Sequence, residues 1–359
     1  MTPLSRRSMF AAPLTQVLSA ERRINVAVIG QLGVNIAPYL KILGSSPSLD
    51  RIALCDESGG LFQYTERYIG PRAKDLSTFR DPAAMLREIR PELVVISLEA
   101  HLAPRKIQMA LEANCHVVVE KPACTNVADF DRLVSLATSR QRHLMLALAT
   151  RIHAGAVKAR QLLLSGALGK PYATTMHWHA DQTRLTKPAY HKSWFASRAK
   201  AGGGKLLFHG IHYLDLIRWM TRDSIKTVTG LYRNVGGQPM DVEDAAVVGM
   251  QFASGWAGTL NTGYYLDRGF SNLIQIWCSN GWLRFDPLVT LEWQVNGNSQ
   301  VQKFSFPDQD LYGLMMESAI RTVLGQEPPF ITARESRDAL AAVFQTYRAA
   351  ETGQAQKVS

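Results

Sequence analysis

Short apolar runs alternate with amphipathic segments along the first part of the chain. Runs of strand length lie at residues 25–29, 51–55, 93–98, 117–119 and 143–149, and helical patterns lie between them at 36–43, 104–113 and 127–139. The run at 93–98 is almost continuously apolar, which is typical of a strand buried on both faces of a sheet. Strands that alternate with helices predict a doubly wound parallel sheet of the Rossmann type over residues 23–150.

The pattern changes after residue 150. Longer runs in which apolar and polar residues alternate lie at 172–180, 225–232, 245–252, 256–264, 273–278 and 281–285, and helical patterns lie at 156–165, 206–219 and 332–350. Alternation of this kind predicts a mainly antiparallel sheet with one covered and one open face. We therefore expect an α/β protein whose second α/β domain, residues 151–359, carries a large open-faced sheet.

Charge and cysteine content narrow the function classes. The formal net charge is +10, and Arg6, Arg7, Arg22 and Arg23 less Glu21 place three of these charges in the first twenty-five residues; elsewhere Lys and Arg form no basic helix and no aromatic-basic stripe. This distribution argues against a nucleic-acid partner. The four cysteines form no CxxC pair, so neither a disulfide framework nor a zinc site is expected. No apolar run approaches the length of about 18–20 residues that spans a bilayer.

The N-terminus has the form of an export signal. Ser5-Arg6-Arg7-Ser8-Met9-Phe10 resembles a twin-arginine motif, and a weakly apolar run leads from it to Ser19-Ala20. The alternative is a disordered basic extension. Residues 1–22 are therefore set apart from the fold, and both the bacterial periplasm and the cytoplasm remain open as locations.

The turn after the first strand is a candidate cofactor site. Gly30-Gln31-Leu32-Gly33-Val34-Asn35 is a degraded GxGxxG, in which Leu32 and Asn35 stand at glycine positions. Backbone N–H groups at such a turn bind a dinucleotide pyrophosphate. Asp56 follows the second strand, where a carboxylate accepts hydrogen bonds from a ribose diol and repels a 2′-phosphate. We therefore expect NAD rather than NADP; the alternative for Asp56 is a cap of the next turn.

Glu120-Lys121-Pro122 follows the strand at 117–119, at the edge of the sheet where ligands bind in open α/β folds. A partly desolvated lysine at this edge can donate a hydrogen bond to a substrate hydroxyl and exchange its proton near neutral pH. The alternative interpretation of Lys121 is a surface loop residue.

Five of the nine histidines lie between His177 and His212. His177, His179 and Asp181 alternate with apolar residues, so one face of their strand is polar and belongs to a pocket or to water. After Gly202-Gly203-Gly204, the residues His209, His212 and Asp215 share one side of a helix. Both sets have workable metal geometry, but a nearby lysine and arginine would oppose the charge, so we expect no metal.

Taken in order, these motifs resemble the Gfo/Idh/MocA oxidoreductases. The resemblance is carried by the turn at Gly30, Asp56, His116-Val-Val-Val-Glu-Lys-Pro122, Arg151, Ser165-Gly-Ala-Leu-Gly-Lys-Pro171, Gly202-Gly-Gly, Gly210-Ile-His212-Tyr-Leu-Asp215 and Val242-Glu-Asp-Ala245. It implies hydride transfer between a nicotinamide and a carbinol of a sugar or cyclitol. It also implies dimers or tetramers that form through the open sheet.

The resemblance assigns roles to individual residues. Lys121 would bridge the nicotinamide and the substrate hydroxyl, the Lys121-Pro122 peptide would be cis, and His212 would be the proton acceptor. In the mechanism that we expect, His212 or Lys121 takes the hydroxyl proton, and His209 is the further catalytic candidate. The implied cofactor contacts are Gly30, Leu32, Gly33, Asp56, Glu120, Lys121, Pro122 and Arg151. The candidate substrate contacts are Lys121, His179, Asp181, Arg184, His209 and His212, with Tyr265 and Trp178 or Trp194 beside them.

The chain departs from the family at one position. The family carries Asp or Glu four residues before the histidine that corresponds to His212, and this chain has Phe208. Without that carboxylate, either His209 or a histidine of the 177–179 strand supplies the second polar contact, or turnover is impaired.

Three functions therefore remain. The leading hypothesis is NAD(P)-dependent oxidation of a secondary hydroxyl on a sugar, glycoside or cyclitol. The second is a glycosidase that uses NAD transiently and cleaves by elimination. The third is an inactive sugar-binding or sensing relative.

Overall fold

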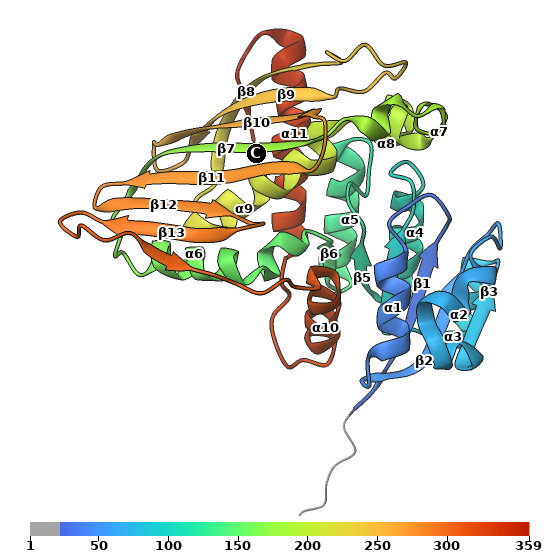
Figure 1. Ribbon diagram of the computed structural model, residues 1–359. Coiled ribbons are helices and arrows are strands. Elements are labelled where there is room, and N and C mark those ends of the chain that lie inside the picture. Colours follow the sequence, from blue (N-terminus) through green and yellow to red (C-terminus); the bar gives the residue numbers. More distant parts are fainter. Residues whose placement is uncertain (1–21, 359) are drawn as a thin grey trace, which may run out of the picture.

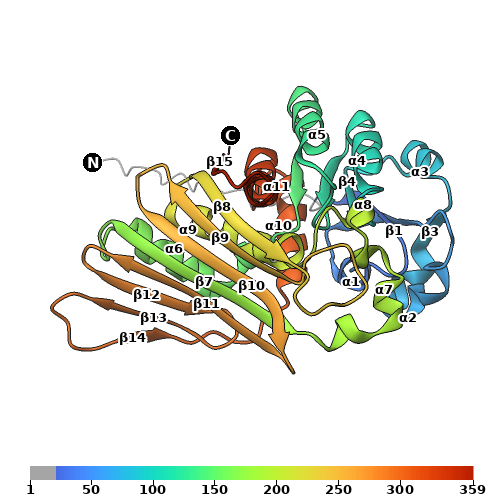
Figure 2. The same ribbon diagram turned by 90° about the horizontal axis from the view of Figure 1, so that it is seen from above.

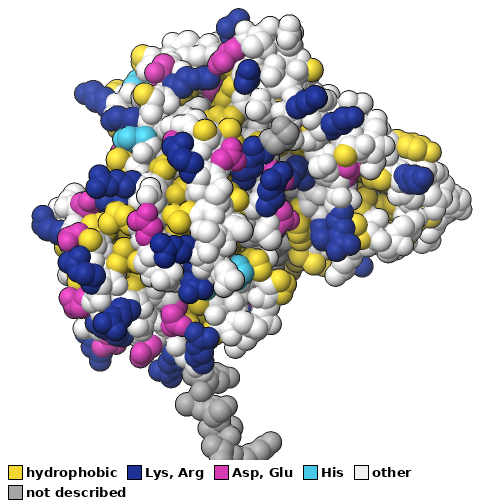
Figure 3. Space-filling view, turned by 180° about the vertical axis from the view of Figure 1, so that it is seen from behind, with side chains coloured by type: hydrophobic (Ala, Val, Ile, Leu, Met, Phe, Trp, Pro, Cys, Tyr) yellow, Lys and Arg dark blue, Asp and Glu magenta, His cyan; other side chains and the backbone are white. Residues whose placement is uncertain are grey.

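The computed structural model describes residues 22–358. The twin-arginine segment lies outside the described residues. Within residues 22–358, no helix combines the length and the apolar character that crossing a bilayer requires. Lys and Arg side chains are spread over the face shown in Figure 3 and do not gather into one patch.

The first sheet has six parallel strands in the order β3-β2-β1-β4-β5-β6. The strands are β1 (Ile24–Gly30), β2 (Leu49–Cys55), β3 (Leu76–Phe79), β4 (Leu93–Ser97), β5 (His116–Val119) and β6 (Leu144–Leu146). The helices are α1 (Ala37–Ser45), α2 (Thr65–Ile69), α3 (Pro82–Ile89), α4 (Ala103–Glu112) and α5 (Val127–Ser139), with 3₁₀ turns η1 (Phe62–Tyr64) and η2 (Gly70–Asp75). The strand order reverses between β1 and β4, which is the switch point where ligands bind in such sheets.

Sequence patterns account for most of this sheet. Every residue of β4 is buried, as the continuous apolar run predicts. The sequence patterns did not predict the edge strand β3 or the helix α3 that follows it. The residues of β3 are half-buried or exposed, so the strand has no apolar run to reveal it.

The second sheet has nine strands in the order β14-β13-β12-β11-β7-β10-β9-β8-β15. They are β7 (Pro171–Asp181), β8 (Ile225–Arg233), β9 (Ala245–Phe252), β10 (Ala257–Leu266), β11 (Phe270–Cys278), β12 (Gly281–Asp286), β13 (Thr290–Val295), β14 (Gln302–Phe304) and β15 (Gln356–Lys357). All neighbours are antiparallel except β7 and β10. The predicted mainly antiparallel sheet is confirmed.

Helices cover one face of the second sheet and leave the other open (Figure 2). The helical segments that follow β6 along the chain, whether or not they cover this face, are η3 (Ala149–Ile152), α6 (Ala154–Leu164), η4 (Thr183–Thr186), α7 (Pro188–His191), η5 (Trp194–Ala196), α8 (Arg198–Ala201), the π-turn η6 (Leu206–Gly210), α9 (Ile211–Thr221), α10 (Leu311–Val323) and α11 (Ala333–Thr352). The helix expected at 206–219 is therefore a π-turn that continues into α9. The prediction missed α10.

The long helix α11 connects the two sheets (Figure 1). It begins with a capping box between Thr332 and Glu335 and packs against α5, α9 and β8. Ser336 on its first turn accepts a hydrogen bond from the backbone N–H of Leu146 in β6, at 3.2 Å. This packing holds the carboxyl edge of the parallel sheet next to η6.

Candidate active site

A cavity of about 180 Å³ lies where the two halves of the chain meet. Its first wall comes from the carboxyl ends of β1, β4 and β5, at the switch point, and its second wall from the segment between β7 and α9. The residues that line it are Val34, Asn35, Leu98, Glu120, Lys121, Arg184, Trp194, Phe195, Phe208 and His209. Five of the residues proposed from the sequence thus share one cavity: Glu120, Lys121, Arg184, Trp194 and His209.

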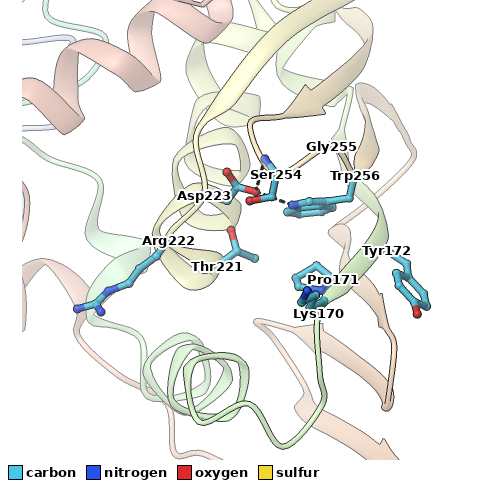
Figure 4. Close-up of a pocket in the computed structure, with 9 residues that line it drawn as sticks. All are labelled: Lys170, Pro171, Tyr172, Thr221, Arg222, Asp223, Ser254, Gly255 and Trp256. Carbon is cyan, nitrogen blue, oxygen red and sulfur yellow. Dashed lines mark hydrogen bonds between the residues drawn. The ribbon is translucent and has the colours of Figure 1, made fainter.

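A larger cavity of about 630 Å³ lies between the start of β7 and the β9–β10 turn (Figure 4). The Asp223 carboxylate in it accepts a hydrogen bond from the Trp256 indole N–H at 2.7 Å. None of the site residues proposed from the sequence lines this cavity. Size alone therefore does not identify the site.

Lys121 projects from the turn after β5. The Lys121-Pro122 peptide is cis, as the resemblance implies. The ammonium of Lys121 donates a hydrogen bond to the carbonyl oxygen of Phe208 at 3.0 Å, and it lies 4.0 Å from a carboxylate oxygen of Glu120. Burial lowers the pKa of Lys121, and the charge of Glu120 partly opposes that shift. A proton on this lysine is therefore easier to release than one on a surface lysine.

Glu120 supports Lys121 from the first wall. Its carboxylate accepts hydrogen bonds from the Asn35 amide and the Tyr39 hydroxyl. Burial raises its pKa, and Lys121 and these hydrogen bonds oppose the shift. The polar groups of this wall are therefore matched to one another.

Phe208 occupies the position at which the family has an acid. Its side chain packs with Ala100, Ala201, Trp194 and Phe195 in a small apolar cluster. Only its backbone carbonyl takes part in the polar site, as the acceptor for Lys121. The residue thus positions the lysine without supplying a carboxylate to His212.

His209 and His212 belong to the turn from η6 into α9. The Nδ1 atom of each is buried and has no hydrogen-bond partner among the described residues. Burial lowers the pKa of both rings well below the usual value, and the neighbouring Lys121 and Lys205 lower it further. Both imidazoles are therefore neutral near pH 7 and able to accept a proton.

Lys205 is a buried residue next to the lining of the cavity that the sequence reasoning missed. Its side chain is 0% exposed, and its ammonium has no hydrogen-bond partner in the described part of the chain. The Nζ atom lies 4.5 Å from the centroid of the Tyr264 ring. Burial lowers the pKa of Lys205 to about 6, with further contributions from Arg184 and Lys121. The spacing of Lys205, His209 and His212, four and three residues apart on one helical face, was the available signal.

The three glycines before Lys205 are required by close packing. A Cβ atom on Gly204 would lie 2.0 Å from the backbone oxygen of Glu243. The Glu243 carboxylate accepts hydrogen bonds from the backbone N–H groups of Gly204 and Leu206 and from the Tyr347 hydroxyl. The acidic segment at 242–245 therefore fixes the start of η6.

Arg184 and Trp194 close the second wall. Arg184 donates to the Tyr264 hydroxyl, and its guanidinium carbon lies 4.9 Å from the centroid of that ring. Its Nε atom is buried without a partner among residues 22–358. The Trp194 indole N–H donates to the carbonyl oxygen of Gly33 at 3.3 Å, so this segment contacts the glycine turn of the first sheet.

His179 and Asp181 do not join this cluster, contrary to expectation. Trp178 faces the helices, with its ring 5.5 Å from that of His212, whereas its strand neighbours point to the open face of the sheet. There the ring of His179 lies 5.0 Å from that of Tyr265. Asp181 accepts a hydrogen bond from the backbone N–H of Thr183 at 2.6 Å. Of the two candidates for the second polar contact near His212, only His209 is placed to supply it.

Arg151 also lies apart from the cavity. Its side chain is 2% exposed and forms a two-pronged ion pair with Asp215, at 2.6 and 2.8 Å, and a further pair with Glu335 at 2.9 Å. The guanidinium is therefore occupied by protein carboxylates. The expectation that Arg151 contacts the cofactor is corrected accordingly, and Asp215 serves this ion pair rather than the histidines.

The turn after β1 has glycine at the two positions, Gly30 and Gly33, where its backbone conformation and packing favour glycine, as expected of a dinucleotide-binding turn. Gly33 has φ of +83°, a conformation that favours glycine, and a Cβ atom on Gly30 would lie 2.4 Å from Ile36. Leu32, at the second glycine position, is 46% exposed on the turn. The cavity reaches from Asn35 at the end of this turn to Lys121, as a nicotinamide site requires.

Asp56 shows the capping contacts that were its alternative interpretation. Its carboxylate accepts hydrogen bonds from the backbone N–H groups of Ser58 and Leu61 and from the Ser58 hydroxyl. A contact with the ribose at Asp56 stays a prediction.

Comparison with known proteins covers both halves of the chain. Residues 24–148 match the oxidoreductase family described as the NAD-binding Rossmann fold of Gfo/Idh/MocA, and residues 156–284 match a Gfo/Idh/MocA C-terminal domain. Myo-inositol 2-dehydrogenase of Thermotoga maritima is 22% identical over 89% of this chain and 93% of its own. D-glucoside 3-dehydrogenase of Escherichia coli is 23% identical over 92% of this chain and 96% of its own.

Solved structures agree on the fold. An oxidoreductase domain protein from Kribbella flavida has a TM-score of 0.85 at 19% identity, covering 94% of this chain and 100% of its own. The WlbA dehydrogenase of Bordetella pertussis, solved with NADH and UDP-GlcNAcA, has a TM-score of 0.78 at 20% identity, covering 94% and 99%. The chain belongs to the Gfo/Idh/MocA family of oxidoreductases and carries that family's NAD-binding Rossmann domain.

Proposed function

We propose that the protein oxidises a secondary hydroxyl of a sugar, glycoside or cyclitol, reversibly and with NAD. The observation that carries the proposal is the position of Lys121 and the neutral His209 in one cavity at the switch point of the parallel sheet, next to His212. The names of the two relatives support it, because a myo-inositol 2-dehydrogenase and a D-glucoside 3-dehydrogenase each act on such a hydroxyl. In this proposal residues 23–150 hold the cofactor, and residues 151–359 hold the substrate and form the oligomer.

The residues that would hold NAD follow the carboxyl edge of the sheet. Gly30, Leu32 and Gly33 would approach the pyrophosphate, Asp56 the ribose, and Glu120, Lys121 and Pro122 the nicotinamide. When bound, NAD supplies the acceptor for the hydride that leaves the carbinol carbon.

The proton of the hydroxyl requires a group of the protein. His212 is neutral and accepts that proton, while Lys121 donates a hydrogen bond to the same oxygen. Together these contacts prevent full negative charge from developing on the carbinol oxygen. The Phe208 carbonyl fixes the direction of the lysine, and His209 supplies a second polar contact beside His212.

Replacement of Lys121 tests the proposal. We expect Lys121→Met to lower kcat for NAD reduction by at least about 100-fold, because the variant removes both the hydrogen-bond donor and the exchangeable proton. The measurement is NADH absorbance over a panel of sugars, glycosides and cyclitols. Lys303→Met, at an exposed lysine of β14 paired with Glu292, is the matched control.

Turnover by Lys121→Met equal to that of the wild type would overturn the assignment. Release of an aglycone without net NADH would instead show the elimination reaction, and ligand-induced stabilisation without any chemistry would show a binding protein.

We also propose that the open face of the second sheet joins copies of the chain. The strand register places Leu231, Val247, Tyr265 and Trp277 on this face, and their side chains are 71%, 43%, 41% and 45% exposed. Exposed apolar side chains on one sheet face are typical of a protein interface. Light scattering of the purified protein gives the subunit count.

A further inference from the structure

Two basic side chains without a counterion among the described residues lie at the second wall: Arg184 lines the cavity, and Lys205 is buried beside it. Lys205 and Arg184 approach the same ring, that of Tyr264, with the Nζ atom and the guanidinium carbon at 4.5 and 4.9 Å from its centroid. Neither side chain forms a salt bridge with any residue between 22 and 358. The Nζ atom of Lys205 and the Nε atom of Arg184 are buried and unpartnered over the same range.

The carboxylates of the surrounding segments already accept hydrogen bonds from other groups of the protein. Glu243 is held by two backbone N–H groups and a tyrosine hydroxyl, and Asp244 accepts hydrogen bonds from the backbone N–H groups of Val235 and Gly236. Glu120 is bound by Asn35 and Tyr39 on the opposite wall. At residue 208, where the family supplies an acid, this chain has Phe208. Among the described residues, none of these three carboxylates is therefore free to pair with Lys205 or Arg184.

Such an arrangement is costly unless a ligand completes it. A buried cation without a counterion loses its hydration and recovers only part of that loss from neighbouring aromatic rings, so native folds seldom retain one. A negatively charged ligand would recover that loss, and the planar guanidinium fork suits a carboxylate, which can accept two N–H groups at once.

We propose that the substrate of this site is a sugar that bears a carboxylate, such as a uronic or aldonic acid, and that Lys205 and Arg184 bind that carboxylate. This inference rests on the proposed function and adds the substrate class to it. A single negative charge suits the site better than a phosphate dianion, because Lys205 is mostly neutral in the empty site at pH 8, His209 and His212 are neutral, and the cavity of about 180 Å³ is small.

The charges around Lys205 give the binding a second signature. The charges that act on Lys205 are Arg184 of η4 and Lys121 after β5. The other titratable groups around it are His179 of β7, His209 of η6, His212 of α9 and Tyr264 of β10, and none of these groups is anionic near pH 7. Lys205, with a pKa of about 6, is mostly neutral at pH 8 in the empty site. A bound carboxylate raises that pKa, so binding takes up a proton from the solvent.

The test compares uronic acids with matched neutral sugars. The NAD-loaded full-length protein is titrated calorimetrically at pH 8 with the gluco, galacto and manno hexuronates, their uronamides, the parent hexoses and the hexose 6-phosphates. Two buffers of different ionisation enthalpy report the proton uptake. We expect at least one hexuronate to bind about tenfold or more tightly than its uronamide, with uptake of close to one proton.

Three results would overturn the inference. They are equal affinity of each uronate and its uronamide, no binding of any uronate, and tighter binding of a hexose 6-phosphate than of every uronate. The last result would assign the same cations to a phosphate.

Two variants connect the preference to its residues. Lys205→Met and Arg184→Gln should each reduce the ratio of uronate to uronamide affinity by about tenfold, and Lys205→Met should also abolish the proton uptake. Lys303→Met is the control, and we expect it to retain both the ratio of uronate to uronamide affinity and the proton uptake. If Lys205→Met unfolds, Arg184→Gln carries the test alone, and an unchanged ratio in a folded variant would contradict the inference.

The readouts separate this inference from the proposed function. Oxidation of neutral hexoses or cyclitols with no preference for uronates would retain the proposed function and overturn the inference. Tight binding of uronates with proton uptake but without NADH formation would support the inference and contradict the proposed function.

Discussion

Two buried cations of this protein have opposite environments. Arg151, after the last strand of the first sheet, is 2% exposed and is paired with Asp215 and Glu335. Lys205, buried beside the cavity, is 0% exposed and its ammonium has no hydrogen-bond partner among the described residues. Both are buried basic side chains, so burial and residue type do not distinguish a structural residue from a site residue. The presence or absence of a counterion does.

The two pKa values reflect this difference. Burial opposes the charge of both side chains, but the carboxylates of Asp215 and Glu335 more than offset it and raise the pKa of Arg151. At Lys205 the neighbouring charges, Arg184 and Lys121, are positive and act in the same direction as burial. The first arrangement stabilises the fold by itself, whereas the second is stabilised only when a ligand supplies the missing charge.

The largest effect is expected at the paired cation. Arg151→Met should lower the free energy of unfolding by about 3–5 kcal/mol, because it leaves the fully buried Asp215 carboxylate without its partner. Urea unfolding at pH 7 measures the loss. The double variant Arg151→Met with Asp215→Leu should recover part of it, since no buried charge then remains. A loss below about 1 kcal/mol would show that the pair contributes little and would weaken the comparison.

The unpaired cation should behave in the opposite way. Lys205→Met should raise the free energy of unfolding of the ligand-free protein by about 1–4 kcal/mol at pH 7, since an apolar side chain replaces a buried, uncompensated amine. The gain should depend on pH. The folded pKa of about 6 lies below the ordinary value of 10.5, so between these values the unfolded chain binds a proton that the folded protein does not.

Wild-type stability therefore rises with pH across this window, and the advantage of Lys205→Met is largest near pH 6 and declines toward pH 10.5. Thermal unfolding of both proteins at pH 6.5, 7.5 and 8.5 measures the trend. A variant that is less stable than the wild type, or equally stabilised at every pH, would contradict the assignment of Lys205 as an unpaired buried cation.

An exposed ion pair is expected to give the smallest change in the free energy of unfolding. Lys303 is 66% exposed and lies 2.8 Å from Glu292 across β13 and β14. Lys303→Met should change the free energy of unfolding by less than about 0.5 kcal/mol, because solvent screens the pair. A change comparable with that of Arg151→Met would mean that burial is not what separates the three sites.

The sequence was informative wherever one local pattern determined the outcome. The buried run of β4, the turn at Gly33 and the cis Lys121-Pro122 peptide each depend on neighbours along the chain or on a motif. The sequence failed at β3, because an edge strand that is only partly buried needs no apolar run. It also missed Lys205, although the spacing of this residue from His209 and His212 was visible.

The alternation of polar and apolar residues in β7 predicted two faces, but not which of them belongs to the site. The structure places Trp178 toward His212 and places His179 on the open side. That choice depends on which face of the sheet α9 covers, and it therefore follows from packing between segments far apart in the chain.

The sequence by itself determined the two sheets, the family and the position of Lys121 at the carboxyl edge of the first sheet. The tertiary structure decided which charges meet. Arg151 and Asp215 are 64 residues apart in the chain, and the fold brings them into one ion pair. Lys205 has no such partner between residues 22 and 358, because the nearby carboxylate of Glu243 is bound by backbone N–H groups. Counterions are assigned by distance in space, which periodicity along the chain does not encode.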